Sequence, residues 1–452
     1  MLTYELKKAP GVPLYEALYR CIRSDILTGK LQPGEKLPSK RALSTHLEVS
    51  KITVESAYNQ LVAEGFVTAR EKIGYFVETI HPALPVAEIP QPEPAVSEIP
   101  AVDLTGSYPA KFPFSVWSKL QREVMLDLGE KLLQPMPHQG IWELRQAISG
   151  HLRSFRGMQV SPECVFVGAG TDFLYNILVQ LLGREQCYAV EEPGYDKIRR
   201  IYAAAGAKCE GVPLDEQGVV PGRLGNANVL HISPNHHFPT GLVTPMIRRQ
   251  QLLQWANARQ DRWIIEDDYD SEFRFNAHPM PAMQSLDRAG KVIYMNTFSR
   301  SLAPAIRISY MVLPPELMEQ LRQRLGFYSC TVPSFEQHTL ARFIAGGHFE
   351  KHINRMRKFY KAQRNRVMDM ILNSQFRDSV AILEENAGLH FLLRTPLSDK
   401  DLSQRCRQEG LRIRTLASYY HGQVPEEHSR CIVVNYGGLS EEELCRLERI
   451  LG

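Results

Sequence analysis

A proline-rich segment divides the chain, and it constrains the fold more than any other feature. Residues 81–102 carry three glutamates and neither Lys nor Arg, and their prolines are Pro82, Pro85, Pro90, Pro92, Pro94 and Pro100. Prolines so close together interrupt helices and favour extended conformations, with a reach on the order of 60 to 70 Å for the whole segment. We therefore predict an N-terminal domain at 1–80, a linker at 81–102 and a large domain at 103–452.

Composition limits the class of protein. With 452 residues, of which 44% are hydrophobic and 23% charged, the chain is typical of a globular protein with at least two domains. Its net charge of +3 gives no global argument for nucleic acid. The eight cysteines are scattered without a Cys-x-x-Cys pair, which argues against a zinc site or a disulfide framework. No signal peptide or membrane-length apolar run is present, so we expect a cytoplasmic protein without a membrane partner.

Residues 1–80 predict three helices followed by a β-hairpin. Ser39 and Ser50 stand where N-caps of the second and third helices are expected. Strands are expected at residues 66–68 and 75–77, on either side of a loop at 70–74. The apolar stripes of the three helices are Leu14, Leu18, Ile22 and Ile26; Leu43 and Leu47; and Val54, Ala57, Tyr58 and Leu61. This order is typical of a winged helix-turn-helix, whose third helix enters the major groove of DNA.

The same segment resembles the DNA-binding domain of the GntR family. The resemblance is carried by Leu37-Pro38-Ser39-Lys40-Arg41-Ala42-Leu43, by Val49-Ser50-Lys51-Ile52-Thr53-Val54, and by Tyr58, Leu61 and Glu64-Gly65. It implies that double-stranded DNA is a partner, and that its contacts are Ser39, Arg41, Ser50, Lys51 and Thr53, with Lys72 and Gly74 in the wing near the minor groove. Tyr75 stands where a small residue is common, which leaves open how deeply the wing enters that groove.

A protein-binding helical module is the alternative for residues 1–80. The excess of basic residues there is small, and a solvated basic face would explain it. Lys40, Arg41 and Lys51 nevertheless gather at the two helix starts that face DNA in this motif, and a dimer would double their contacts. DNA binding is therefore the preferred interpretation.

Residues 103–452 alternate short apolar runs with helical stretches. Such alternation predicts an α/β domain with a mainly parallel sheet and a ligand site beyond the carboxyl ends of the strands. Examples of the runs expected to form strands are 165–167, 187–190, 229–232, 263–265 and 292–295.

This region resembles fold-type I aminotransferases and, among them, the domain that MocR/GabR regulators fuse to a GntR-type reader. The motifs that carry the resemblance are residues 140–145, 168–171, 192–195, 233–241, 266–274, 294–307, 348–357 and 388–390. It implies a site for pyridoxal 5'-phosphate. In that site Tyr195 would stack on the ring, Asp267 would pair with the ring nitrogen and Tyr269 with the phenolic oxygen. Residues implied at the phosphate are Gly170, Thr171, Thr297, Ser299 and Arg307.

Each motif also has a simpler explanation when it is taken alone. Glycine-rich turns before helices are common, Asp267 and Asp268 could cap the next element, and His236 and His237 could be turn residues. Metal binding is disfavoured because no carboxylate or cysteine lies at ligand spacing from these histidines. The order of several motifs along one chain is what favours the aminotransferase-like fold.

Two positions depart from the enzymes. Arg300 holds the place of the lysine that forms an imine with the cofactor, and no lysine lies between Lys291 and Lys351. A guanidinium stays protonated and cannot form that imine, so we expect no catalytic residue and no ordinary amine transfer. Val433 aligns with an arginine that often binds a substrate carboxylate; Arg412, Arg414 or Arg430 could compensate.

The preferred interpretation is a DNA-binding transcription regulator that forms a homodimer and senses a small molecule. Three hypotheses remain open for the large domain: it holds pyridoxal 5'-phosphate or an adduct noncovalently, with Arg300 adding a cation; it holds another small molecule; or it is an aminotransferase-like enzyme with residual activity on a preformed adduct. A purely structural dimerisation domain is the fourth alternative, which the retained Asp267, Tyr269 and Arg307 disfavour.

Overall fold

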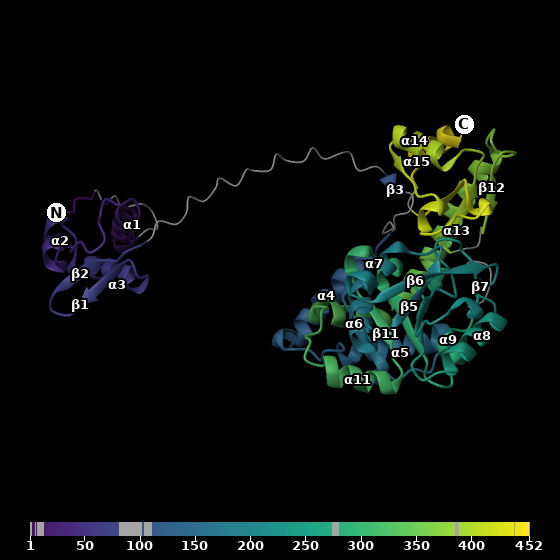
Figure 1. Ribbon diagram of the computed structural model, residues 1–452, viewed down its shortest axis with the longest axis horizontal. Helices are drawn as coiled ribbons and strands as arrows, with labels where there is room; N and C mark the ends of the chain where they lie inside the picture. The colour runs from purple at the N-terminus through teal and green to yellow at the C-terminus, as the bar shows by residue number, and fades with distance from the viewer. Residues whose placement is uncertain are drawn as a thin grey trace. The chain divides into compact units, whose positions relative to one another are not determined.

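The chain forms two compact units, Met1–Ser97 and Glu98–Gly452 (Figure 1). The computed structural model describes residues 2–4, 6, 13–80, 102–103, 111–273, 280–384, 388–437 and 439–451. Residues 81–101 of the predicted linker lie outside the described residues, and the described part resumes with the short strand β3 (Val102–Asp103).

The N-terminal unit contains the three predicted helices, α1 (Leu14–Leu27), α2 (Lys40–His46) and α3 (Lys51–Ala63). Both predicted N-caps are confirmed: the Ser39 hydroxyl accepts a hydrogen bond from the Ala42 amide and the Ser50 hydroxyl from the Thr53 amide, each at 3.1 Å. The apolar stripes meet in one core, whose members include Leu18, Ile22, Leu43, Val54, Tyr58 and Leu61.

A hairpin completes this unit, with strands β1 (Val67–Arg70) and β2 (Gly74–Val77). The strands reach closer to the turn than predicted, because Arg70 pairs with Gly74 across the ladder. The expected five-residue loop is therefore wrong, and the turn holds only residues 71–73. Lys72 at the tip adopts φ of 61°, in the left-handed region.

The large unit is built on an eight-stranded sheet with the order β4-β11-β10-β9-β8-β5-β6-β7. Its pairs are parallel except that β11 runs antiparallel to both of its neighbours and β7 is antiparallel to β6, so the mainly parallel prediction is confirmed. The strands are β4 (Val165–Gly168), β5 (Cys187–Glu192), β6 (Lys208–Asp215), β7 (Gly218–Val219), β8 (Val229–Ile232), β9 (Trp263–Asp267), β10 (Val292–Thr297) and β11 (Ser309–Val312). All five predicted runs form strands of this sheet, whereas β6, β7 and β11 were not predicted.

Helices cover both faces of this sheet. Successive strand residues point to opposite sides, so neighbouring apolar residues of one strand pack against different helices. In β9, Ile264 packs into one core cluster with residues of α8, and Ile265 into another with residues of α6 and α11. The helices of the large unit are α4 (Phe114–Leu128), α5 (Trp142–Arg156), α6 (Thr171–Leu182), α7 (Asp196–Ala204), α8 (Met246–Asn257), α9 (Met283–Leu286), α10 (Phe298–Ser301), α11 (Pro315–Leu325), α12 (Ser334–Ala345), α13 (His348–Asn373), α14 (Asp399–Gln408) and α15 (Glu441–Leu451).

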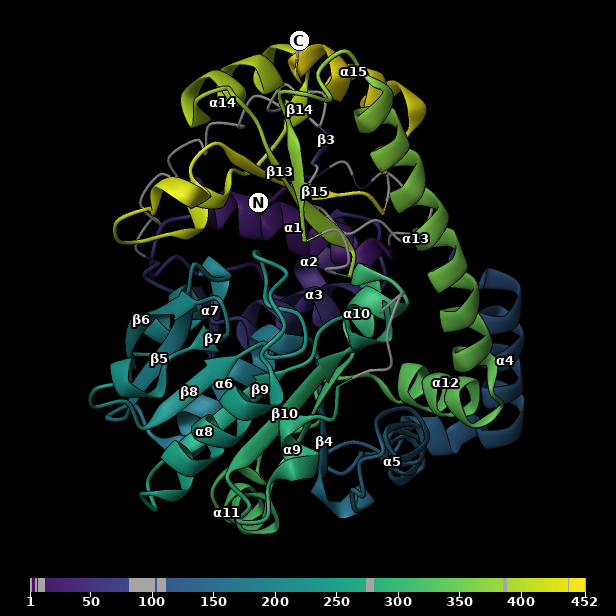
Figure 2. The ribbon, with the colours of Figure 1, turned by 90° about the vertical axis from the view of Figure 1, so that its right-hand side faces the viewer.

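The C-terminal part carries a smaller antiparallel sheet of β12 (Ala381–Leu383), β13 (His390–Arg394) and β15 (Cys431–Asn435). Beside it, β14 (Leu411–Arg412) pairs in parallel with β3. The long helix α13 runs from α12 to the part that carries α15 (Figure 2). Among the described helices, none combines the length and the apolar character needed to cross a bilayer.

Candidate functional site

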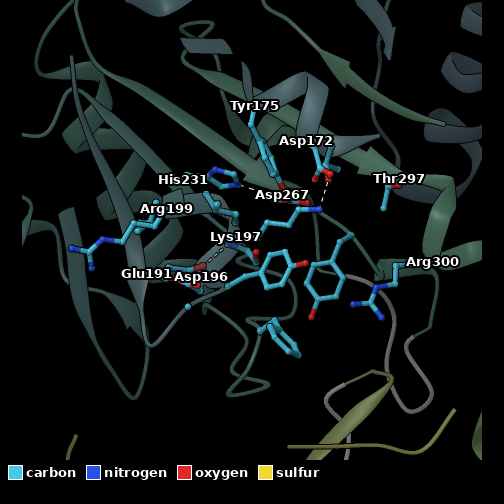
Figure 3. Close-up of a pocket in the computed structure, with 18 of the residues that line it drawn as sticks. Asp172, Tyr175, Glu191, Asp196, Lys197, Arg199, His231, Asp267, Thr297 and Arg300 are labelled. Carbon is cyan, nitrogen blue, oxygen red and sulfur yellow. Dashed lines mark hydrogen bonds and ion pairs between the residues drawn. The ribbon is translucent and has the colours of Figure 1, made fainter. Parts of the chain in front are cut away.

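A pocket of about 270 Å³ lies where β5, β8, β9 and β10 end and α6 and α7 begin (Figure 3). This is the edge at which parallel sheets bind ligands. The pocket brings together eight of the nine residues predicted from the sequence: Thr171, Tyr195, Asp267, Tyr269, Thr297, Ser299, Arg300 and Arg307. The ninth, Gly170, precedes α6 and packs against the side chain of Arg307.

Asp267 lies at the end of β9 and is only 5% exposed. Its Oδ2 accepts a hydrogen bond from the Tyr175 hydroxyl at 2.6 Å, and His231 Nε2 lies 3.5 Å from the same oxygen. The ring of His231 is held in turn by the Tyr202 hydroxyl, 2.7 Å from Nδ1. The other oxygen of Asp267, Oδ1, has no hydrogen-bond partner within the described part of the chain. A buried carboxylate oxygen of this kind is suited to a protonated ring nitrogen.

Tyr269 and Arg300 form the neighbouring wall. The Tyr269 hydroxyl is buried and makes no hydrogen bond to any described residue. Burial raises the pKa of this phenol well above its ordinary value, and Arg300 opposes the shift without cancelling it. The guanidinium carbon of Arg300 lies 5.9 Å from the centre of the Tyr269 ring. Arg300 thus brings a cation into the pocket beside Tyr269.

The opposite end is suited to an anion. Gly170 has φ of 87° and precedes the twelve-residue helix α6, whose first amide groups are available to a negative charge. A Cβ atom on Gly170 would lie 2.3 Å from Arg307 Nη2, so only glycine lets this guanidinium lie against the backbone. Ser299 Oγ is buried without a partner in the described residues. The Thr297 hydroxyl instead accepts hydrogen bonds from the Ser299 amide at 3.1 Å and the Ser309 hydroxyl at 2.7 Å.

Tyr195 forms an aromatic wall with Phe238. The two rings lie edge to face with centres 6.0 Å apart, and Phe238 contacts Tyr419 in the same manner at 5.3 Å. Tyr195 and Phe238, which belongs to the 233–241 motif, both line the pocket.

Among the described side chains, Arg414 and Arg430 do not restore a carboxylate clamp in the pocket. Val433 is fully buried in a small apolar cluster with Leu392 and Tyr419. Arg414 lies over the Tyr419 ring, 5.8 Å from its centre. Within the described residues, neither Arg414 nor Arg430 lines the pocket, and the side chain of Arg412 lies outside the described part.

Sequence reasoning missed several charged residues of the pocket, among them Asp172 and Lys197. The Lys197 ammonium lies 2.6 Å from Asp172 Oδ2 (Figure 3). Arg307 Nη2 lies 3.3 Å from the same oxygen. Lys197 belongs to α7, far before Arg300 in the chain, and therefore lies outside the segment in which the reactive lysine of the enzymes is expected. Its place two residues after Tyr195, at the start of a helix that follows a predicted strand, was the available signal.

In the N-terminal unit, five of the predicted DNA contacts are exposed: Ser39, Arg41, Ser50, Lys51 and Lys72. Thr53 and Gly74 are partly buried, and the Thr53 and Ser50 hydroxyls lie 2.9 Å apart. Lys40, counted with Arg41 as a basic cluster, is paired with Glu55, which raises the pKa of the lysine and lowers that of the carboxyl. Ile52, which was not predicted, is 74% exposed at the start of α3.

Comparisons with known proteins agree with both units. The family model "Bacterial regulatory proteins, gntR family" matches residues 14–77, and "Aminotransferase class I and II" matches residues 105–450. Among solved structures, kynurenine aminotransferase from Pyrococcus horikoshii has a TM-score of 0.68 at 24% identity, over 78% of this chain and 91% of that one. LysN from Thermus thermophilus, solved with N-(5'-phosphopyridoxyl)-L-leucine, has a TM-score of 0.67 at 23% identity, over 78% and 92%. These two likenesses establish the fold of the large unit.

Full-length relatives identify the combination of the two units. An uncharacterized HTH-type transcriptional regulator, YhdI of Bacillus subtilis, is 38% identical over 98% of this chain and 96% of that protein. The pyridoxine biosynthesis transcriptional regulator PdxR of Corynebacterium glutamicum is 32% identical over 94% and 92%. The probable rhizopine catabolism regulatory protein MocR of Rhizobium meliloti is 31% identical over 97% and 93%. The chain therefore belongs to the MocR/GabR-type transcription regulators, which join a gntR-family winged helix to a class I and II aminotransferase domain.

Proposed function

We propose that this regulator senses pyridoxal 5'-phosphate, or an adduct of it, held noncovalently in the large domain, and that it does not transfer amines. One observation carries the proposal: three buried polar atoms without partners among the described residues, Asp267 Oδ1, Tyr269 Oη and Ser299 Oγ, belong to residues that line one pocket. Leaving such atoms unpaired costs about 1 to 3 kcal/mol each, so a ligand that pairs them gains that energy.

The residues present fit this ligand. Asp267 would pair with the ring nitrogen, Tyr269 would donate to the phenolic oxygen and Tyr195 would cover a ring face. The phosphate would meet Ser299, Arg307 and the first amide groups of α6, beside Gly170 and Thr171. The cofactor supplies an electron-withdrawing ring and an aldehyde that reacts with amines. The similarity to PdxR, a pyridoxine biosynthesis transcriptional regulator, supports a ligand of this chemical class.

Arg300 separates sensing from catalysis. Its guanidinium remains protonated at any physiological pH, so it offers no lone pair for a covalent bond to an aldehyde. It lies in the pocket beside Tyr269, where it can donate hydrogen bonds to an oxygen of the ligand. The pocket therefore retains the groups that recognise the cofactor and lacks the group that would make it an amine carrier.

The N-terminal domain (1–80) reads double-stranded DNA, the linker (81–102) spaces it and the large domain (103–452) forms a homodimer. α3 enters the major groove with Lys51 and Thr53 among its contacts, while Arg41 of α2 and Lys72 of the wing add further contacts. Ligand binding that favours one arrangement of the large domains shifts the spacing of the two readers. Small-angle scattering of the dimer with and without ligand tests this step, and identical profiles would contradict it.

The central test is calorimetric titration of pyridoxal 5'-phosphate into the full-length protein, with absorption spectra recorded at each step. We expect heat of binding without an imine band, and no amine turnover by the loaded protein. Heat together with an imine band would overturn the noncovalent mode, and turnover would favour an enzyme. If neither heat nor a band appears, the ligand is another small molecule and the proposal fails.

A further inference from the structure

Asp172 is a carboxylate at the anion-binding end of the pocket. It belongs to the first turn of α6, and its Oδ2 lies 2.6 Å from Lys197 Nζ and 3.3 Å from Arg307 Nη2. One carboxylate oxygen thus bridges a cation from α7 and a cation from the segment before β11. The two cations are the ones best placed to meet a phosphate group at the start of α6.

The bridge lies at the open side of the pocket. The side chains of Asp172, Lys197 and Arg307 are 36%, 45% and 50% exposed. Ion pairs with this exposure are screened by water and weak, so they can exchange partners at little cost. Deeper in the same pocket, Asp267 is 5% exposed and its Oδ1 lacks a partner in the described residues, as does Ser299 Oγ. The pocket therefore has two kinds of polar group. Its inner part contains buried atoms without partners among the described residues, and its open side carries ion pairs that can exchange partners.

We propose that Asp172 is a built-in competitor for the phosphate of the effector: it occupies Lys197 and Arg307 in the free protein and gives them up when a phosphate-bearing ligand binds. The inference rests on the proposed function, since it assigns a regulation to the same pocket. It also assigns Lys197 as a second phosphate-binding cation, in addition to Arg307.

This arrangement sets the threshold of the sensor. A phosphate dianion near the N-terminus of α6 must displace a like charge before it gains both cations, so the affinity is lower than the pocket alone would give. The displacement also breaks the link between α6 and α7 that the Asp172–Lys197 pair makes. Ligand occupancy is thereby converted into a changed contact between two helices of the large domain.

The test compares Asp172→Asn with the unchanged protein by calorimetric titration of pyridoxal 5'-phosphate and, separately, of pyridoxal, which lacks the phosphate. Asp172→Asn should tighten binding of the phosphate form about tenfold, because one like charge is removed from its neighbourhood, and should leave pyridoxal affinity unchanged. Asp196→Asn is the matched control: Asp196 also lines the pocket but pairs with Arg200 and His421 rather than with Arg307. This control should change affinity for the phosphate form by about twofold or less.

Variants of Lys197 distinguish a cation that binds phosphate from an amine that reacts with the ligand. Lys197→Met should weaken binding of the phosphate form, whereas Lys197→Arg should retain it because only the cation is needed. If the unchanged protein binds pyridoxal 5'-phosphate but Asp172→Asn does not tighten it, the competitor role is wrong and the proposed function stands. If neither protein binds either compound, the proposed function itself fails. An imine band that disappears in Lys197→Arg would overturn the inference by making Lys197 a reacting amine.

Discussion

The candidate functional polar groups are exposed or already hydrogen-bonded in the N-terminal unit, whereas in the pocket of the large unit several are buried without partners among the described residues. In the N-terminal domain (residues 1–80, the reader), the hydroxyls of Ser39 and Ser50 cap helices, while Arg41 and Lys51 are exposed to solvent. In the pocket, Asp267 Oδ1, Tyr269 Oη and Ser299 Oγ are buried without partners among the described residues. Exposed charges are solvated by water when DNA is absent. A buried polar atom, in contrast, lowers the free energy of unfolding by about 1 to 3 kcal/mol if nothing pairs with it.

This difference bears on whether the large domain is only a relic of an enzyme. A domain retained for dimerisation alone would gain stability by losing its buried unpaired groups, since most such replacements are neutral or favourable. The pocket instead retains them together with Gly170, whose lack of a side chain accommodates Arg307. A binding role for the pocket is the simplest reason for that cost.

The largest expected effect would convert the pocket into an ordinary cofactor site. Arg300→Lys should give a visible imine band with pyridoxal 5'-phosphate, because it restores an amine at the position where the fold delivers one. Spectra before and after borohydride reduction, with mass mapping of the labelled peptide, check the attachment to residue 300. Binding of the variant to duplex DNA should stay unchanged. A folded dimer that shows no band would contradict a pocket shaped for this cofactor.

Removing the buried charge tests the deep end of the pocket alone. Asp267→Asn should weaken binding of pyridoxal 5'-phosphate by about 2 kcal/mol, roughly thirtyfold, because a charge-assisted hydrogen bond to the ring nitrogen is lost. The asparagine oxygen can still accept from Tyr175, which limits damage to the fold. Calorimetry measures the affinity, and the melting temperature of the variant serves as the control. Unchanged affinity would remove Asp267 from the binding site.

How much the sequence could predict differs between fold and site for physical reasons. Residues 229–232 were predicted as a strand because a strand buried on both faces is a nearly continuous apolar run, interrupted here only by His231. β6 (Lys208–Asp215) was missed because it lies near the sheet edge, where charged and half-exposed residues interrupt the pattern. Motif order placed Asp267 and Arg307 in one pocket. The Asp172–Lys197 bridge depends on how α6 packs beside α7, which no spacing along the chain encodes.

Burial in the pocket also predicts a pH dependence for the stability of the large unit. Burial raises the pKa of Glu191, which lines the pocket, to about 8, with the Ser233 amide opposing the shift and Asp267 adding to it. A raised pKa means that the folded state holds the proton more tightly. The stability contributed by Glu191 is therefore complete below its unfolded pKa of about 4.5 and is lost as pH rises towards 8.

Glu191→Gln should remove this dependence. Between pH 5.5 and 7.5, the unfolding free energy of the variant should rise relative to the unchanged protein by about 1.4 kcal/mol per pH unit. Denaturant titrations followed by tryptophan fluorescence report the large domain alone, because all four tryptophans lie there: Trp117, Trp142, Trp255 and Trp263. A constant difference across this pH range would show that Glu191 is ionised in the folded protein.

The smallest expected effect divides two lysines of the reader. Lys51→Ala should weaken binding to random-sequence duplex DNA roughly two- to tenfold and lower the salt dependence by about one ion per reader, because an exposed lysine at the start of α3 contacts a phosphate. Lys40→Ala is the matched control, since its ammonium is already paired with Glu55 and lies 5.8 Å from the centre of the Tyr75 ring. It should change the salt dependence less. Fluorescence anisotropy over a salt series measures both effects. Equal losses of affinity in the two variants would mean that Lys40 leaves Glu55 and binds a DNA phosphate. Glu55 would then compete with DNA for Lys40, as Asp172 competes with the ligand phosphate for Lys197 and Arg307.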